Sequence, residues 1–154
     1  MRQYLSVLLA GAAVLLITPL AAFAQDEAES VPVFHYVTVT TFNHPGGEEG
    51  GLVGRYIETV LSPLAKIDSN IVSFKAAQHT WGSNSAQIVL IYEYADWAAI
   101  ESDDCEACDA WFEANWPAED TPEWEEWDAM VQAYSRAYLG HSDEIYTVNM
   151  DLAK

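Results

Sequence analysis

The sequence predicts an α+β domain in which an antiparallel sheet carries helices on one face. Segments rich in β-branched and aromatic residues alternate with segments whose apolar residues recur at spacings of three and four. Their order is strand, helix, strand, strand, helical region, strand. The two middle strands are joined by Gly82-Ser83-Asn84-Ser85, a short turn that suits an antiparallel hairpin. This is the order of a ferredoxin-like domain.

Residues 1–24 are expected to be a cleavable secretory signal peptide. A basic residue is followed by an apolar run at 5–20 and by Ala22-Phe23-Ala24, the small-x-small pattern that signal peptidase reads. The run is shorter than the roughly 20 residues of a membrane-spanning helix, which disfavours a retained anchor. We therefore expect an exported protein, periplasmic or extracellular, that keeps no membrane attachment after cleavage. A flexible lead-in at 25–33 and a single domain at 34–152 should follow.

The first strand is expected at residues 34–42 (FHYVTVTTF), followed by a glycine-containing turn at 43–47. A helix should follow at 52–67, and Pro63 should kink or divide it, because proline has no amide hydrogen. The apolar residues that define the buried side of this helix are Tyr56, Val60, Leu64 and Ile67.

Residues 71–81 (IVSFKAAQHTW) and 86–94 (AQIVLIYEY) are the second and third strands. Because successive side chains of a strand point to opposite faces, this hairpin has one apolar face and one mixed face. The apolar face should be the main layer of the core. Its residues are Val72, Phe74, Ala76, Ile88, Leu90, Tyr92 and Tyr94.

An acidic, cysteine-containing insertion is expected at about 101–121, after a short helix that Asp96 can cap. It contains Cys105 and Cys108, and oxidised cysteines are the default in an exported protein. Two cysteines alone do not make a zinc site. The neighbouring acids should raise the pKa of a thiol, which opposes the thiolate that a redox site needs. We therefore favour a local disulfide between Cys105 and Cys108.

The second long helix should begin at Thr121-Pro122, where a capping hydroxyl precedes a proline at the first helical position. Gly140 should end it, and residues 144–150 (EIYTVNM) should form the last strand. Aromatic and apolar residues recur along this helix at three and four, which indicates a core-facing stripe. They are Trp124, Trp127, Val131, Tyr134 and Tyr138.

The chain is strongly acidic, with 24 acidic and 6 basic residues and a formal net charge of −18. Loss of the one basic residue in the leader makes the mature charge −19. Such a chain is repelled by nucleic acid and by anionic lipid, so neither partner is expected. A soluble acidic surface explains the composition. The alternative is a cation-binding surface, but the acids match no ordered calcium loop.

The mixed face of the hairpin suits ligand binding or proton transfer. Lys75, His79 and Trp81 lie on one strand and Glu93 on the other, with His35 of the first strand as a potential neighbour. A histidine beside an aromatic side chain and a carboxylate can act as a general base or anchor a polar ligand. The plainer interpretation is a rim histidine and a Lys75–Glu93 ion pair. His35, His79 and Glu93 are suitable metal ligands but form no spacing motif, so no metal is predicted.

Residues 91–100 (IYEYADWAAI) resemble the strand-to-helix passage of the dimeric α+β barrel superfamily. That superfamily includes antibiotic-biosynthesis-type monooxygenases and stress-responsive barrel proteins. The resemblance implies a homodimer in which two sheets form a barrel, and it implies a ligand cavity between sheet and helices. The Asn, Trp and His set of the haem-degrading members is not recognisable here, and no cofactor is predicted.

Three functions stay open. The first is an exported protein that binds a small molecule between sheet and helices, with His79, Trp81 and Glu93 lining the pocket. The second is a cofactor-independent monooxygenase that holds a phenolic or polyketide-like substrate in the same pocket. The third is a metal-binding or redox protein centred on Cys105 and Cys108. No nucleophile motif accompanies His79, so hydrolase chemistry is not predicted.

Overall fold

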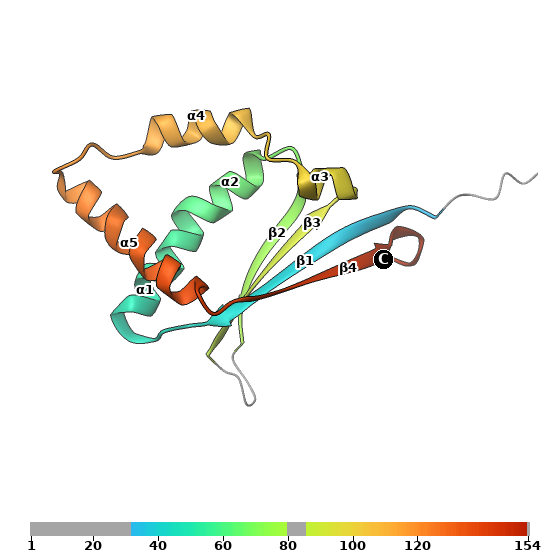
Figure 1. Cartoon of the computed structure of the whole chain (residues 1–154), viewed down its shortest axis with the longest axis horizontal. Helices are drawn as coiled ribbons and strands as arrows, with labels where there is room; N and C mark the ends of the chain where they lie inside the picture. The colour runs from blue at the N-terminus through green and yellow to red at the C-terminus, as the bar shows by residue number, and fades with distance from the viewer. Residues whose placement is uncertain (1–31, 80–85, 154) are drawn as a thin grey trace, which may run out of the picture. The chain divides into compact units, whose positions relative to one another are not determined.

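A sheet of four strands organises the structure, a computed structural model that describes residues 32–79 and 86–153 (Figure 1). The predicted signal peptide and the predicted site residue Trp81 lie outside these residues. Within them, no helix combines the length and the apolar character needed to cross a membrane. The elements are β1 (Phe34–Asn43), α1 (Gly47–Tyr56), η1 (Ile57–Leu61), α2 (Ser62–Ile67), β2 (Ile71–Gln78), β3 (Gln87–Tyr94), α3 (Trp97–Glu101), α4 (Glu106–Asn115), α5 (Pro122–Tyr138), β4 (Ser142–Asn149) and η2 (Met150–Leu152).

The strands pair antiparallel in the order β2-β3-β1-β4, which places β1 and β3 in the centre and β2 and β4 at the edges. This strand order, with a helical segment after β1 and another after β3, is the ferredoxin-like topology. The predicted fold class is therefore confirmed. In the hairpin register, Ser73 lies opposite Glu93 and Lys75 lies opposite Ile91.

The two faces of the sheet differ, because the helices lie on one side of it (Figure 1). On the covered face, Phe42, Ile88 and Leu90 pack with helical residues such as Val53 and Ala133 into the core. Val72 was expected in this layer but is 52% exposed, because the pairing of β2 with β3 is irregular between Ile71 and Ser73. The residues of the opposite, open face include His35, Val37, Val39, Ser73, Lys75, Val89, Ile91 and Glu93.

The first helical segment is continuous but widens in the middle. The amide of Ser62 donates to the carbonyl of Ile57, five residues earlier, which makes η1 a π-helix. Pro63 follows at once and has no amide hydrogen to give to the preceding turn. The predicted interruption at Pro63 thus takes the form of a π-helical turn, a feature common at functional sites. The segment also begins at Gly47, earlier than expected.

The insertion after α3 contains a helix that the sequence did not indicate. Asp96 caps α3 by accepting a hydrogen bond from Ala99 at 2.8 Å. Thr121 caps α5 by accepting one from Trp124 at 3.2 Å. Both caps had been predicted. Between them, α4 packs its aromatic side chains against the first turns of α5. The aromatic residues that join the two helices are Trp111, Trp116, Trp124 and Trp127.

Candidate functional site

A cleft lies between the first helical segment and the β2–β3 hairpin. Its volume is about 430 Å³, within the range of roughly 300–1,000 Å³ typical of ligand pockets. The apolar side chains of Ile57, Phe74 and Ile88 line it together with several polar groups. The other described lining residues are His44, Gly54, Glu58, Ser62, Ala76, Ala77 and Gln78. An apolar surface with a few polar groups is the usual character of a small-molecule site.

His44 is held in a defined orientation in this cleft. It lies in the loop between β1 and α1, and the backbone amide of Gly46 donates to its ring Nδ1 at 3.0 Å. The neutral imidazole must then carry its proton on Nε2. The ring lies directly against Gly50 of α1, so close that a Cβ at this position would overlap it. His44 therefore offers a ligand a hydrogen-bond donor, and Gly50 makes room for the ring.

The π-helical turn supplies another part of the cleft. Ile57 and Glu58 of η1 and Ser62 at its end all line the cleft. The extra residue in a π-turn changes the direction in which the following side chains point. Glu58 carries the only carboxylate among the described lining residues, and these include no lysine or arginine. The cleft thus combines a donor at His44 with an acidic group at Glu58.

A second polar cluster lies on the open face of the sheet. His35 Nδ1 lies 2.7 Å from Glu93 Oε1, and the Ser73 hydroxyl donates to Glu93 Oε2 at 2.7 Å. The hydrogen bonds from His35 and Ser73 lower the pKa of the Glu93 carboxyl from its ordinary value. Because Ser73 bonds the carboxylate and not the imidazole, it is not placed as an activated nucleophile.

The predicted site residues are only partly brought together. His35 and Glu93 form the pair just described, and Lys75 lies on the same face opposite Ile91, two positions along the strands from Glu93. His79 is exposed just beyond the end of β2, where its amide donates to Gln87 at 2.9 Å. None of these described residues lines the cleft. Their role in ligand binding stays a prediction.

A cluster of tyrosines fills the space between the covered face and the helices. Tyr56 stacks on Tyr134 with ring centroids 4.5 Å apart, and Tyr134 stacks on Tyr138 at 5.5 Å. Burial raises the pKa of Tyr92 and of Tyr134 far above the ordinary value. These phenols therefore stay protonated at neutral pH. They contribute to packing in the core and do not transfer protons.

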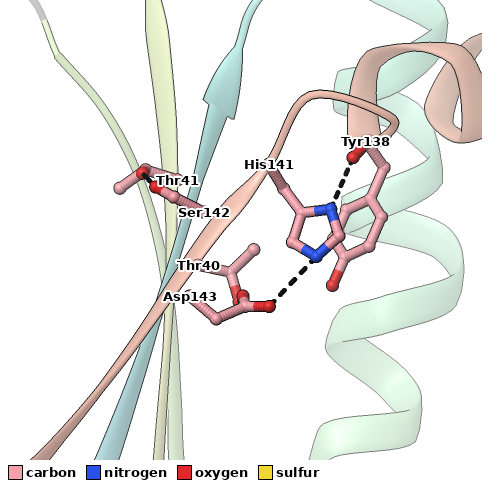
Figure 2. Close-up of polar contacts among 6 residues, drawn as sticks. All are labelled: Thr40, Thr41, Tyr138, His141, Ser142 and Asp143. Atoms are coloured by element: carbon pink, nitrogen blue, oxygen red, sulfur yellow. Dashed lines mark hydrogen bonds and ion pairs between the residues drawn. The ribbon is translucent and has the colours of Figure 1, made fainter.

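His141 and Asp143 join the end of α5 to the sheet (Figure 2). Asp143 Oδ1 accepts a hydrogen bond from the buried Thr40 at 2.6 Å, and Oδ2 lies 3.0 Å from His141 Nε2. His141 Nδ1 lies 2.7 Å from the carbonyl of Tyr138. Both ring nitrogens are therefore engaged, and neither is left to contact a substrate. We interpret this group as structural.

The insertion cysteines lie at the start of α4. Cys105 and Cys108 lie at disulfide distance, with Cα atoms 5.1 Å apart, as predicted. The Asp68 carboxylate lies near both sulfur atoms. Sulfur atoms bonded to each other are not the thiolates that a metal needs, so this group of three is not a metal site in the oxidised protein.

The sequence interpretation missed His44 and Glu58. His44 lies in a turn signal, Asn-His-Pro-Gly-Gly, which predicts a loop and says nothing about a side chain. Gly50, six residues after His44, was a potential signal, but the sequence placed it before the predicted helix, and only the structure shows it inside α1. A glycine inside a helix often marks a close approach by another group.

No family model and no curated protein matches this chain. Several solved structures are similar in fold. A NIPSNAP family protein from Agrobacterium tumefaciens has 14% identity and a TM-score of 0.44, over 77% of this chain and 95% of that chain. A dimeric ferredoxin-like protein from an uncultured marine organism has 8% identity and a TM-score of 0.46, over 78% and 92%. SnoaB, a cofactor-independent oxygenase from Streptomyces nogalater, has 13% identity and a TM-score of 0.42, over 78% and 98%.

Proposed function

We propose that this protein is exported and binds a small organic molecule in the cleft beside His44. The observation that carries the proposal is the fixed imidazole at the edge of an apolar cleft of about 430 Å³. A protein gains affinity when a polar group is oriented before the ligand arrives, because less entropy is lost on binding. The bond from Gly46 and the contact with Gly50 provide this orientation.

The same geometry favours binding over base-assisted oxygenation. To deprotonate a phenol, His44 would have to accept a proton, but neutral Nε2 already carries one and Nδ1 is occupied by the Gly46 amide. The ring is thus suited to donate a hydrogen bond to a ligand oxygen. A phenol or another hydroxylated aromatic compound fits this donor and the apolar residues of the cleft.

Export supports the oxidised state of Cys105 and Cys108, because disulfides persist outside the cytoplasm. We propose cleavage after Ala24. The test is the amino terminus of the protein recovered from the periplasm or the medium. It should begin at Gln25, and retention of residues 1–24 on the recovered protein would contradict the proposal.

We also propose a homodimer that buries the open face of the sheet. Half-buried aliphatic side chains form a band along β1 and β3 on the open face, and none of the helices in the described part of the chain lies over that face. A sheet with an uncovered apolar face usually buries it against another layer. A second copy supplies the same band by symmetry. The band consists of Val37, Val39, Val89 and Ile91.

The ligand proposal is tested by calorimetric titration of the mature protein with 4-ethylphenol. Binding to the unaltered protein should weaken about tenfold or more in His44→Ala, because one oriented hydrogen bond is lost. His35→Ala removes an imidazole from the open face and serves as the matched control, so its affinity should not change. Equal losses in both variants, or no loss in His44→Ala, would reject the cleft as the site.

A further inference from the structure

We infer that the cleft selects ligands with a protonated amine attached to an apolar ring, and that it discriminates against carboxylates. This inference rests on the proposed function, because it concerns the ligand class of the same cleft. It is based on the placement of Glu58, on the charges around it and on the apolar residues opposite.

The apolar part of the cleft suits a flat ring. Phe74 and Ile88 belong to neighbouring strands, and Ile57 faces them from the helix. Phe74 is itself packed against Tyr92, with ring centroids 4.7 Å apart, and this contact restrains its ring. A ligand ring that covers these side chains removes apolar surface from water, which is the main favourable term in such binding.

Glu58 makes the cleft negatively charged. It is exposed, and within the part of the chain that the structure describes it forms no ion pair. The arginines of the two long helices α1 and α5 are already paired with acids. Arg55 contacts Glu126 at 2.9 Å, and Arg136 contacts Glu49 at 2.8 Å. A cationic ligand therefore finds a carboxylate, and no lysine or arginine is among the described residues that line the cleft.

The charge of the whole chain acts in the same direction. A formal net charge of −18 lowers the potential around the protein, which attracts cations and repels anions. A carboxylate ligand would approach this field and then meet Glu58 without a basic partner in the described lining. A protonated amine is attracted both during its approach to the protein and by Glu58 in the cleft. His44 can still donate to a hydroxyl or carbonyl oxygen on the same ligand.

Three probes with the same phenol ring test the inference: tyramine, which is cationic, 4-ethylphenol, which is neutral, and 4-hydroxyphenylacetate, which is anionic. The mature protein should bind tyramine tightest and 4-hydroxyphenylacetate weakest in low salt. Glu58→Gln should weaken tyramine binding about three- to tenfold, as expected for a partly exposed ion pair, and should leave 4-ethylphenol unchanged. Glu48→Gln removes the same charge from the exposed first turn of α1 and is the matched control.

The outcomes separate the inference from the proposed function. If 4-ethylphenol binds in a His44-dependent way but tyramine binds no tighter, the proposed function stands and the amine preference is wrong. If Glu48→Gln weakens tyramine as much as Glu58→Gln does, net charge alone sets the preference and the assignment to Glu58 is wrong. If none of the three probes binds, both proposals fail.

Discussion

The covered and open faces of the sheet give residues that are adjacent in the sequence different degrees of burial. Leu90 and Ile91 are adjacent on β3, yet Leu90 is 1% exposed under the helices and Ile91 lies half-buried on the open face. The covered face holds the core and, at its β2 edge, the cleft with His44. The open face holds the His35–Glu93 pair beside an aliphatic band. The core and the proposed ligand site thus belong to one face, and the proposed dimer interface belongs to the other.

The largest expected effect is on folding. Leu90→Ala should lower the free energy of unfolding by about 2–5 kcal/mol, because it removes a fully buried side chain and leaves a cavity. Ile91→Ala, the matched control on the open face, should cost the monomer about 1 kcal/mol or less, since little buried surface is lost. Urea unfolding at low protein concentration measures both. Equal costs would remove the distinction between the faces.

The next effect concerns assembly. Ile91→Asp places a charge in the aliphatic band and should raise the dimer dissociation constant about hundredfold or more, because an unpaired buried charge costs several kcal/mol. Sedimentation equilibrium measures the constant. Glu48→Asp, on the helical side, should leave it unchanged. A variant that still dimerises like the unaltered protein would show that another surface forms the dimer.

A smaller effect is expected from Gly50→Ala. The added methyl group should push the His44 ring aside, because the ring and not the backbone occupies the space above Gly50. Affinity for 4-ethylphenol should fall about tenfold. The free energy of unfolding should change by no more than about 1 kcal/mol, since alanine is the better helix former. Thermal unfolding and calorimetry separate these results, and unchanged affinity would show that the position of His44 is unimportant.

The smallest effect is the pH dependence of the His35–Glu93 pair. The pKa of Glu93 is lowered in the folded state, so its contribution to stability is present above the ordinary value of 4.5 and is lost as the pH falls through the folded-state value. The difference in unfolding free energy between the unaltered protein and Glu93→Gln should therefore shrink below pH 4.5. A difference that grows in acid would contradict the assigned hydrogen bonds.

The fold was largely predictable because its signals are local. Strand alternation and the caps at Asp96 and Thr121 depend on nearby residues, and the structure shows the antiparallel pairing of β2 with β3 and both caps. The His35–Glu93 contact was foreseeable because both residues lie on the same face of paired strands. The helix α4 was missed because its acids and cysteines mask a short helix whose packing comes from aromatic contacts with α5.

The cleft was not predictable in the same way. His44 reaches it from a loop, and the orientation of the ring depends on Gly46 and Gly50 together. Glu58 lines it from within a π-helical turn, which helix periodicity does not anticipate. Strand alternation pointed to the mixed face of the hairpin, and that is the face away from the helices. Tertiary contacts, and not local patterns, create the cleft.

The central claim is that ligands bind on the covered side of the sheet. Amide chemical-shift mapping of the mature, isotope-labelled protein during titration with 4-ethylphenol tests it most directly. We expect the largest shifts at His44, Gly54 and Glu58, with the amides of His35 and Glu93 unaffected. Largest shifts at His35 and Glu93 would place the ligand on the open face and contradict the claim.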